Sequence, residues 1–498
     1  MIGPVTVIIL LLAIPLAYGT RAEPQTSSLD LATQRLVLAD YLNPWSNPMI
    51  SGRWDGWKSS CNGAALHDPT YEYPNGTRDI ASVYYPIIGP YDAGDDAVMQ
   101  YHIRLAQTAG IDALVVEWDG TKGFYDFPAI NSRFSRLLSI AERLGFSVAI
   151  LYDAYRFYVG STTKPQSGLI PKRSDVIQVV HDDLSFVIKE YGSSASYLKF
   201  NGKPVIFSGT GIDSLKATEW AHIFESLQNE DLRAYYISQG DQSSLSYYPY
   251  YQGVSPWISV SAILRGDTTP IDFINEQTST ISRFGRGISF GVSVWPGFDD
   301  GPVQGWCTST RQIDRAKGKL YNNTWVAAIQ NKPTWIYIIT FNDWNEGTII
   351  EPSVQFGYKY LEATTFYSAK FKHQQPRYDG IPVPLAIYNA TLAIRKAESQ
   401  GRAVGLDDAR AKLDQAKNSF DSKQYSESLT LAKQALELAN KATVPLTSST
   451  RITTVTSSSS NVIQTSLLKY EWYLLPAAVL VVGVIFMIVR RVRRTVKH

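Results

Sequence analysis

The feature that most constrains the fold is an alternation of apolar, strand-like runs with helix-like segments between residues 35 and 341. The eight predicted strands are Arg35–Leu42, Ile111–Trp118, Phe146–Tyr152, Pro204–Ser208, Ala234–Ser238, a run within Gly253–Ile263, Ile288–Val294 and Trp335–Phe341. The predicted helices between them are Asp95–Ala109, Ile130–Leu144, Ser174–Tyr191, Ser214–Leu227, Pro270–Phe284 and Arg311–Ile329. This alternation is typical of parallel βα units, and eight of them predict an α/β fold, a closed (β/α)8 barrel of the TIM type, within residues 34–380.

The last predicted strand leads into a cluster of acids and amides around an indole, in the segment WIYIITFNDWNEGTIIEP from Trp335 to Pro352. Active sites of such barrels lie just beyond the carboxyl ends of the strands. Asp343 and Glu346 are three residues apart, so a helical turn would place both carboxyl groups on one face. One of two neighbouring carboxyls can keep its proton while the other is ionised, which is what cleavage of a glycosidic bond requires. The alternative is a strand end with an Asx-type cap and a solvated turn.

Other predicted strands also end in acidic or aromatic residues, as expected for the rim of a sugar-binding barrel. The candidate substrate contacts are Tyr41, Trp45, Glu117, Asp153, Tyr155, Trp295 and Asp299, together with Asn342 and Trp344 of the last segment. For each of them, packing at the barrel mouth or helix capping is the alternative. The composition suits a glycan ligand, because the 12 Trp and 30 Tyr supply flat rings that can pack against sugar faces.

Charge and cysteine content argue against a nucleic-acid-binding protein and against a zinc protein. The chain carries 47 basic and 45 acidic residues, a balance that predicts no binding of nucleic acid. The two cysteines, Cys61 and Cys307, show neither CxxC nor His-rich spacing, so we expect no zinc site and no cofactor. They are expected either to form one disulfide in an oxidising compartment or to be two unrelated buried thiols.

Both ends of the chain contain apolar stretches. Residues 1–23 hold the run Val5–Ala17, which is typical of a signal peptide or of an uncleaved N-terminal anchor. Trp472–Val489 is a stretch of about 18 apolar residues, long enough to form a transmembrane helix. The basic tail that follows, residues 490–498, is expected in the cytoplasm, which places the rest of the chain in the extracellular space or a lumen. We therefore expect a single-pass protein of the cell membrane.

The region between the barrel and the predicted span has two parts. Residues 384–443 carry apolar side chains at helical spacing and predict a small α-helical hairpin region of two or three helices, which acts as a spacer. A partner-binding module is the alternative. Residues 444–468 are dense in Ser and Thr, which predicts a flexible stalk. Sequons at Asn75, Asn322 and Asn389 fit an exterior location.

Several blocks of sequence occur in one order along the chain. They are YLNPW (41–45), DIASVYYPIIGPY (79–91), AGIDALVVEW (109–118), YDAY (152–155), KPVIF (203–207), WPGFDD (295–300) and TFNDWNEGTIIEP (340–352). Together they resemble glycoside hydrolase family 99, the endo-α-mannosidase family, from Leu36 to Tyr367. Several blocks in one order are far more specific than any single block.

The resemblance implies a barrel enzyme that cleaves within α-mannoside-containing glycans, with retention and without a metal. Glu346 matches the family's general acid/base. Asp343 matches a carboxylate thought to pull on the 2-hydroxyl of the sugar, so that an anhydro sugar forms instead of a glycosyl-enzyme. The family has Glu-Trp-His-Glu where this chain has Asp343-Trp344-Asn345-Glu346. Because Asp is one methylene shorter and a general base needs contact at about 2.6–3.2 Å, the backbone, the substrate or the activity is expected to differ.

Three functions follow from these observations. The predicted one is a membrane-anchored, outward-facing endo-glycosidase that acts on an oligosaccharide or glycan. The second is a non-catalytic glycan-binding or structural surface protein on the same barrel. The third is a glycosyl-transferring enzyme, because a retaining site can pass a sugar to an acceptor other than water.

Overall fold

The computed structural model describes residues 34–444, apart from residues 62–63, 122–126, 154–172, 210–214, 241–244 and 285–287. The predicted leader, transmembrane helix and basic tail lie outside these residues, as does the predicted stalk after its first residue. Within the part of the chain that is described, no helix is long and apolar enough to cross a membrane.

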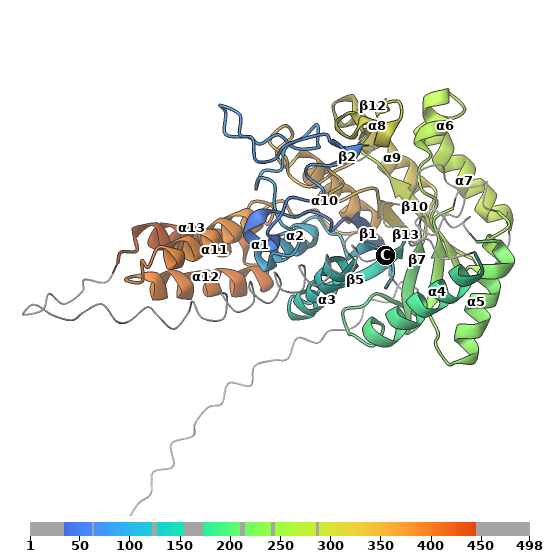
Figure 1. Cartoon of the computed structure of the whole chain (residues 1–498), viewed down its shortest axis with the longest axis horizontal. Helices are drawn as coiled ribbons and strands as arrows, with labels where there is room; N and C mark the ends of the chain where they lie inside the picture. Colours follow the sequence, from blue (N-terminus) through green and yellow to red (C-terminus); the bar gives the residue numbers. More distant parts are fainter. Residues whose placement is uncertain are drawn as a thin grey trace, which may run out of the picture. The chain divides into compact units, whose positions relative to one another are not determined.

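Eight parallel strands in the described residues close into a barrel (Figure 1). They are β1 (Leu36–Tyr41), β4 (Ala113–Trp118), β5 (Ser147–Tyr152), β7 (Lys203–Ser208), β8 (Tyr235–Ser238), β9 (Gly253–Val254), β10 (Ser289–Val294) and β13 (Trp335–Ile338). Neighbours in the sheet follow chain order, and the pairs β5–β7 and β1–β13 complete the circle. The predicted (β/α)8 barrel is confirmed. The strand predicted within Gly253–Ile263 is only two residues long, and Pro256, which lacks an N–H, follows it.

Helices cover the outside of the barrel: α2 (Asp96–Thr108), α3 (Phe127–Arg143), α4 (Arg173–Phe186) with its π-helical extension η2 (Val187–Tyr191), α5 (Ala217–Asn229), α6 (Val260–Arg265), α7 (Pro270–Phe284), α9 (Lys319–Gln330) and α10 (Lys359–Phe371). One predicted helix starts late. The segment Arg311–Ile329 is helical only from Lys319, because its first residues pair in a small hairpin, and Ala316 and Lys317 have positive φ.

The remaining elements are short. They are α1 (Pro48–Ser51), the hairpin of β2 (Ser60–Cys61) and β3 (Ala64–Ala65), β6 (Lys199–Phe200) antiparallel to β7, η5 (Tyr248–Tyr250), the hairpin of β11 (Phe298–Asp299) and β12 (Gln312–Ile313), η6 (Gly301–Val303), α8 (Gln304–Cys307) and η7 (Ala316–Gly318). Most of them lie in the long segments after β1 and β10.

Side chains of the barrel strands alternate between two apolar clusters. On β1, Leu36 and Leu38 join the cluster inside the barrel, whereas Val37 and Tyr41 join the cluster between the barrel and its helices. Because successive residues of a strand point to opposite faces, Asp40 lies on the inner side, at the carboxyl end of the strand. The barrel interior is therefore apolar below and acidic at its mouth.

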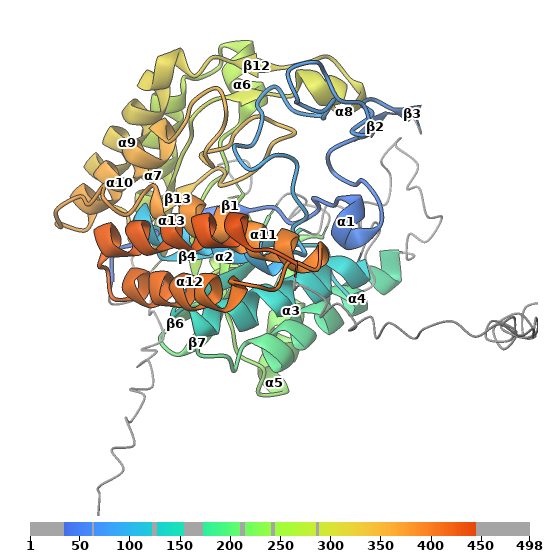
Figure 2. The same ribbon diagram turned by 90° about the vertical axis from the view of Figure 1, so that its left-hand side faces the viewer.

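Three helices follow the barrel and lie side by side (Figure 2): α11 (Val383–Ser399), α12 (Leu406–Asp421) and α13 (Tyr425–Lys441). They share an apolar core of their own. The first of them packs along α2. The ring of Tyr388 lies 5.3 Å from that of Tyr101, and Arg395 Nη1 is 2.8 Å from Asp95 Oδ1. The predicted helical region thus consists of three helices and is in contact with the barrel.

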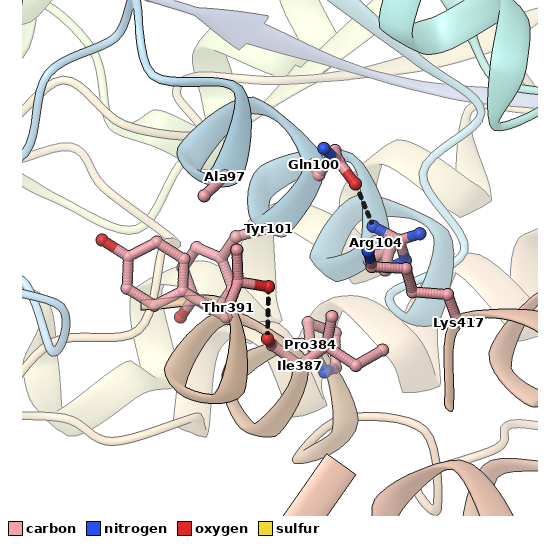
Figure 3. Close-up of a pocket in the computed structure, with 9 residues that line it drawn as sticks. Ala97, Gln100, Tyr101, Arg104, Pro384, Ile387, Thr391 and Lys417 are labelled. Carbon is pink, nitrogen blue, oxygen red and sulfur yellow. Dashed lines mark hydrogen bonds between the residues drawn. The ribbon is translucent and has the colours of Figure 1, made fainter. Parts of the chain in front are cut away.

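A cavity of about 20 Å³ remains between α2 and α11 (Figure 3), room for about one water molecule. Arg104 of α2 lines it, and its Nη1 donates to Gln100 Oε1 at 3.3 Å. The guanidinium carbon of Arg104 also lies 5.6 Å from the ring of Phe420 on α12. A buried cation therefore bridges the barrel and the helical region.

Candidate active site

The chain after β13 folds back on itself and presents residues 343–347 as a turn at the barrel mouth. Thr340 N–H donates to Thr348 O at 3.1 Å, and Ile350 N–H donates to Phe341 O at 3.1 Å. Gly347 closes the turn with φ of +60°, and a Cβ there would approach Asp299 O to 3.2 Å. The sequence puts glycine where both the backbone conformation and the space require it.

Asp343 is held within this turn. Its Oδ1 accepts the Glu346 N–H at 2.9 Å, and its own N–H donates to Thr340 Oγ1 at 2.8 Å. The side chain is 8% exposed, and burial raises the pKa of Asp343 to about 6, against the backbone hydrogen bonds from Glu346 and Asn345 that lower it. An Asx-type cap and a perturbed carboxyl group therefore coexist in one residue.

Glu346 stands on the same turn and carries the higher pKa. Burial, and after it the charge of Asp343, raises the pKa of Glu346 to about 8, while hydrogen bonding to Trp306 and the charge of Arg311 lower it. Trp306 Nε1 donates to Glu346 Oε1 at 2.9 Å. Between about pH 6 and 8, Asp343 is thus mainly ionised and Glu346 mainly protonated, a base and an acid whose environments separate them.

Further acids gather inside the barrel mouth. Glu117 at the end of β4 and Asp153 just after β5 act electrostatically on Asp40 or on each other. Tyr337 of β13 donates its hydroxyl to Asp40 Oδ1 at 2.8 Å. Burial raises the pKa of both Asp40 and Glu117, and repulsion between neighbouring carboxylates adds to the rise. Of the predicted contacts, Glu117 and Asp153 are therefore brought together with Asp343.

Four predicted contacts lie elsewhere, behind the turn. Tyr41 faces outward, and its hydroxyl shares a hydrogen bond with His102 Nδ1 at 3.0 Å. Trp45 is fully buried against Trp57, with ring centroids 4.5 Å apart. Asn342 bonds the backbone of the segment after β1, and Trp344 is fully buried. These side chains support the loops that carry the site, and the structure does not bring them to the acidic mouth.

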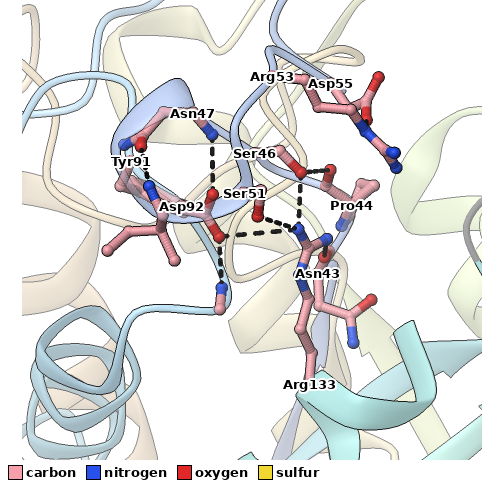
Figure 4. A network of polar contacts seen from close by, with 12 residues as sticks. Asn43, Pro44, Ser46, Asn47, Ser51, Arg53, Asp55, Tyr91, Asp92 and Arg133 are labelled. Carbon is pink, nitrogen blue, oxygen red and sulfur yellow. Dashed lines mark hydrogen bonds and ion pairs between the residues drawn. The ribbon is translucent and has the colours of Figure 1, made fainter. Parts of the chain in front are cut away.

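The segment that carries Trp45 is fixed by an arginine from the neighbouring helix (Figure 4). Arg133 of α3 donates through Nη1 to Asn43 O at 2.8 Å and through Nη2 to Ser46 Oγ at 2.6 Å. The same Nη2 lies 3.6 Å from Asp92 Oδ1, so the buried cation is paired with a buried carboxylate. The first loop of the barrel mouth is therefore held rigidly.

The last three predicted sugar contacts lie in different surroundings or outside the described residues. Trp295, the residue after β10, is buried in the cluster inside the barrel. Asp299 bonds within its own hairpin, since its Oδ2 accepts from Gln312 Nε2 at 2.8 Å, and its backbone N–H donates to Glu346 O at 2.8 Å. Tyr155 lies outside the described residues.

A buried polar network that the sequence did not reveal supports the turn from behind. Glu351 accepts hydrogen bonds from Tyr91 Oη at 2.9 Å and from Trp344 Nε1 at 3.2 Å on one oxygen. Its other oxygen lies 3.1 Å from His102 Nε2 of α2. Both side chains of this pair are fully buried, so the turn is anchored to the helix through them.

Arg315 supports the turn from another side. Its Nη2 donates to Gly347 O at 2.7 Å and to Ile349 O at 2.9 Å. Its guanidinium carbon lies 4.4–4.9 Å from three aromatic rings, those of Tyr84, Phe356 and Tyr360. The ring faces stabilise the cation in this cage.

The segment after β10 is tied to the segment after β1. Cys61 and Cys307 form a disulfide with Cα atoms 5.4 Å apart, which decides between the two predicted states of these cysteines. His67 Nε2 also bonds Pro302 O at 3.0 Å, and its Nδ1 lies 2.7 Å from Asp79 Oδ1. Among the described residues, no group of His, Cys, Asp and Glu is arranged to hold a metal ion.

A closed (β/α)8 barrel with two unequal carboxyl groups at the end of its last strand is the arrangement found in barrel glycoside hydrolases. The sequence profile of glycosyl hydrolase family 99 matches residues 32–241 and 274–378, more than half of the chain. The chain therefore belongs to this family, and the predicted resemblance and the prediction of a glycoside hydrolase are confirmed.

The chain is also similar to individual proteins whose names state an activity. The chain is 23% identical over 386 residues to a glycoprotein endo-alpha-1,2-mannosidase of Mus musculus, covering 68% of this chain and 76% of the relative. The corresponding protein of Rattus norvegicus is 23% identical over 390 residues, covering 69% and 76%. The GH99 endo-alpha-mannosidase structure from Bacteroides thetaiotaomicron superimposes with a TM-score of 0.53 at 25% identity, covering 68% of this chain and 97% of that one.

Proposed function

We propose that the chain is a retaining endo-glycosidase that cleaves α-mannoside-type linkages within glycans. The observation that carries this proposal is the pair of Asp343 and Glu346 on one turn, with pKa values of about 6 and 8. The mannoside specificity rests on the relatives, whose names describe endo-acting α-mannosidases.

In this proposal the ionised Asp343 removes the proton from the 2-hydroxyl of the bound sugar. The 2-oxygen attacks the anomeric carbon, while protonated Glu346 gives its proton to the leaving oxygen, so an anhydro sugar and a shortened glycan form. Glu346, now ionised, removes a proton from water, which opens the anhydro ring at the anomeric carbon, and the 2-oxygen recovers its proton. Two displacements at one carbon give net retention. Each carboxyl ends the cycle in its starting state.

The acidic mouth is proposed to bind the sugar that is cleaved. Glu117 and Asp153 lie near Asp343 and can accept hydrogen bonds from sugar hydroxyls, while protonated Glu117 can also donate one. Trp295, Asp299 and Tyr155 remain proposals as sugar contacts. The proposed contribution of Tyr41, Trp45, Asn342 and Trp344 is to hold the loops in place.

The experiment is digestion of reducing-end-labelled mannan and N-glycans with the wild-type chain and three variants. We expect shorter products from the wild type, none from Glu346→Gln, and a severe loss for Asp343→Asn. Glu362→Gln is the matched control, because it makes the same chemical change at an exposed position of α10 and should retain full activity. Full activity of Glu346→Gln would refute the assignment of the general acid.

The same digestion distinguishes the alternative functions. Products longer than the substrate would indicate glycosyl transfer, since the anhydro intermediate would then be opened by a sugar hydroxyl. Binding of the labelled glycan without any new product would indicate a glycan-binding surface protein. Both outcomes leave the barrel and its acidic mouth unchanged but replace the proposed reaction.

We also propose that the barrel is held at the outer or lumenal face of the cell membrane by the helix at residues 472–489. The support is the sequence alone: an apolar stretch followed by a basic tail, with a Ser/Thr-rich segment before it. Fractionation tests this. The full chain should sediment with membranes and resist extraction by high salt, and a chain ending at residue 468 should not.

A further inference from the structure

The loop that carries Trp306 holds a costly backbone conformation. Gln304, Gly305, Trp306 and Cys307 follow one another with φ of 50°, 56°, 52° and 73°, and three of the four are not glycine. Non-glycine residues in this left-handed region cost free energy and persist only where the surroundings enforce them, often at functional sites. Here the disulfide at Cys307 and the bond from Gly305 N–H to Asp300 O at 3.0 Å enforce it.

In this conformation the indole of Trp306 hydrogen-bonds Glu346 and is also exposed to solvent. Its Nε1 donates to Glu346 Oε1 at 2.9 Å, yet the side chain remains 46% exposed. Eight other tryptophans of the described residues are almost fully buried, so the exposed indole of Trp306 is an exception among the tryptophans that the structure describes. Neither packing nor the hydrogen bond alone explains why a large apolar ring is kept in solvent beside the acid.

The position of the ring follows from the chemistry of the acid, and this step rests on the proposed function. A general acid must approach the leaving oxygen to about 2.6–3.2 Å. Since Glu346 Oε1 is bonded to Trp306, the other oxygen of the carboxyl group is the one that reaches the leaving oxygen. The sugar that carries the leaving oxygen then lies beside the indole. The flat face of the indole suits the C–H face of a pyranose.

We propose that Trp306 forms the binding platform for the first sugar on the leaving-group side of the cleaved bond, and that its N–H orients Glu346. The two roles belong to different parts of one side chain. The N–H fixes the carboxyl oxygen, and the ring face binds the departing sugar. The strained turn and the Cys61–Cys307 bond keep both in place before the substrate arrives.

Two substitutions separate these roles. Trp306→Phe keeps an aromatic face but loses the N–H, and Trp306→Ala loses both. Each variant is assayed on a manno-oligosaccharide, whose leaving group is a sugar, and on the matching nitrophenyl glycoside, whose leaving group is not. Phe366→Ala on α10 is the control, because it removes another exposed aromatic ring, 43% exposed, without touching the site.

For Trp306→Ala we expect KM for the manno-oligosaccharide to rise about tenfold, as for truncation of an aromatic anchor, with little change for the nitrophenyl glycoside. For Trp306→Phe we expect KM to stay close to the wild-type value. The alkaline limb of its pH–rate profile should move to higher pH, because the N–H that stabilises ionised Glu346 is gone. A role confined to folding would move neither the leaving-group dependence nor the pH limb.

The outcomes distinguish this inference from the proposed function. An unchanged KM in Trp306→Ala, or an equal rise for both leaving groups, overturns the platform and leaves the glycosidase intact. If the wild type cleaves neither substrate, the proposed function fails, and titration of the same manno-oligosaccharide into wild type and Trp306→Ala decides the platform. Tenfold weaker binding by the variant supports it, and equal binding refutes it.

Discussion

Replacing Glu346 with Gln is expected to stabilise the folded chain at alkaline pH while it abolishes catalysis. Burial and the neighbouring charge of Asp343 raise the pKa of Glu346 from its ordinary 4.5 to about 8. A carboxyl group whose pKa is raised by folding binds its proton more tightly in the folded state. Its contribution to the free energy of unfolding is therefore complete only below the pKa of the unfolded state. This contribution is lost as the pH rises through the folded value, so wild-type stability falls between about pH 4.5 and 8.

The size of the effect follows from the same values. A rise from 4.5 to about 8 corresponds to roughly 5 kcal/mol if the whole shift acts on folding. Glu346 is partly exposed, so solvent screens part of the interaction, and about 2–4 kcal/mol is a sounder expectation. Gln keeps the length of the side chain and an oxygen that accepts the Trp306 N–H, so the substitution isolates the charge.

The assay is thermal unfolding of wild type and variant from about pH 4 to 9, with Glu362→Gln as an exposed control. The difference in Tm should be near zero at pH 4 and grow to several degrees by pH 9. The control should show no such growth, because its carboxylate stays in water. If Glu346→Gln is no more stable than wild type at pH 9, the carboxyl group is not desolvated as the structure indicates, and the acid assignment loses its physical basis.

Three further predictions concern the same site. The wild-type kcat/KM should follow a bell-shaped pH profile with limbs near 6 and 8, measured on a labelled glycan, and a flat profile would contradict the separated acid and base. Arg315→Met should lower the free energy of unfolding in urea by about 2–4 kcal/mol, because two carbonyls and three ring faces lose their cation. Cys61→Ser should cost about 2–5 kcal/mol, since the disulfide spans 246 residues, and reductant should affect wild type but not the variant.

The architecture could be predicted from the sequence because the barrel depends on local patterns. Buried parallel strands are near-continuous apolar runs, and the helices between them show regular spacing, so both patterns can be recognised in a single sequence. The prediction was wrong at residues 311–318. A hairpin with β11 and two residues of positive φ displace the start of α9 there. Such pairing depends on residues 298–299, outside the segment, so residues 311–318 alone carry no signature of it.

The pair at the centre of the candidate site could be predicted from the sequence. Which neighbouring side chains point into the barrel could not. A strand buried on both sides gives no hydrophobic alternation, so the sequence does not show which residues face the interior. The sequence predicts Tyr41 as the contact at the end of β1, but the adjacent Asp40 is the side chain on the inner face. The acidic residue inside an apolar run was the available signal, because a buried carboxyl needs partners such as Tyr337.

The supporting residues could not be found from spacing at all. Trp306 and Glu346 are 40 residues apart in the sequence, and His102 and Glu351 are 249 apart. Only the fold brings them together. The run Gln304–Cys307 did contain a hint, a glycine followed by Trp and Cys, but nothing in it specifies that the indole reaches an acid on another loop.

The shorter acid at position 343 acquires a physical explanation from the turn. Asp, unlike Glu, has the side-chain length to accept a hydrogen bond from a backbone N–H a few residues ahead, and Asp343 accepts that of Glu346 at 2.9 Å. The bond fixes the two carboxyl groups relative to each other. A glutamate at this position, as in the family pattern, would leave that N–H without this partner. The shorter side chain is therefore fixed within the turn. In the proposed reaction, the 2-hydroxyl of the substrate would have to lie deeper in the acidic mouth to reach this shorter base.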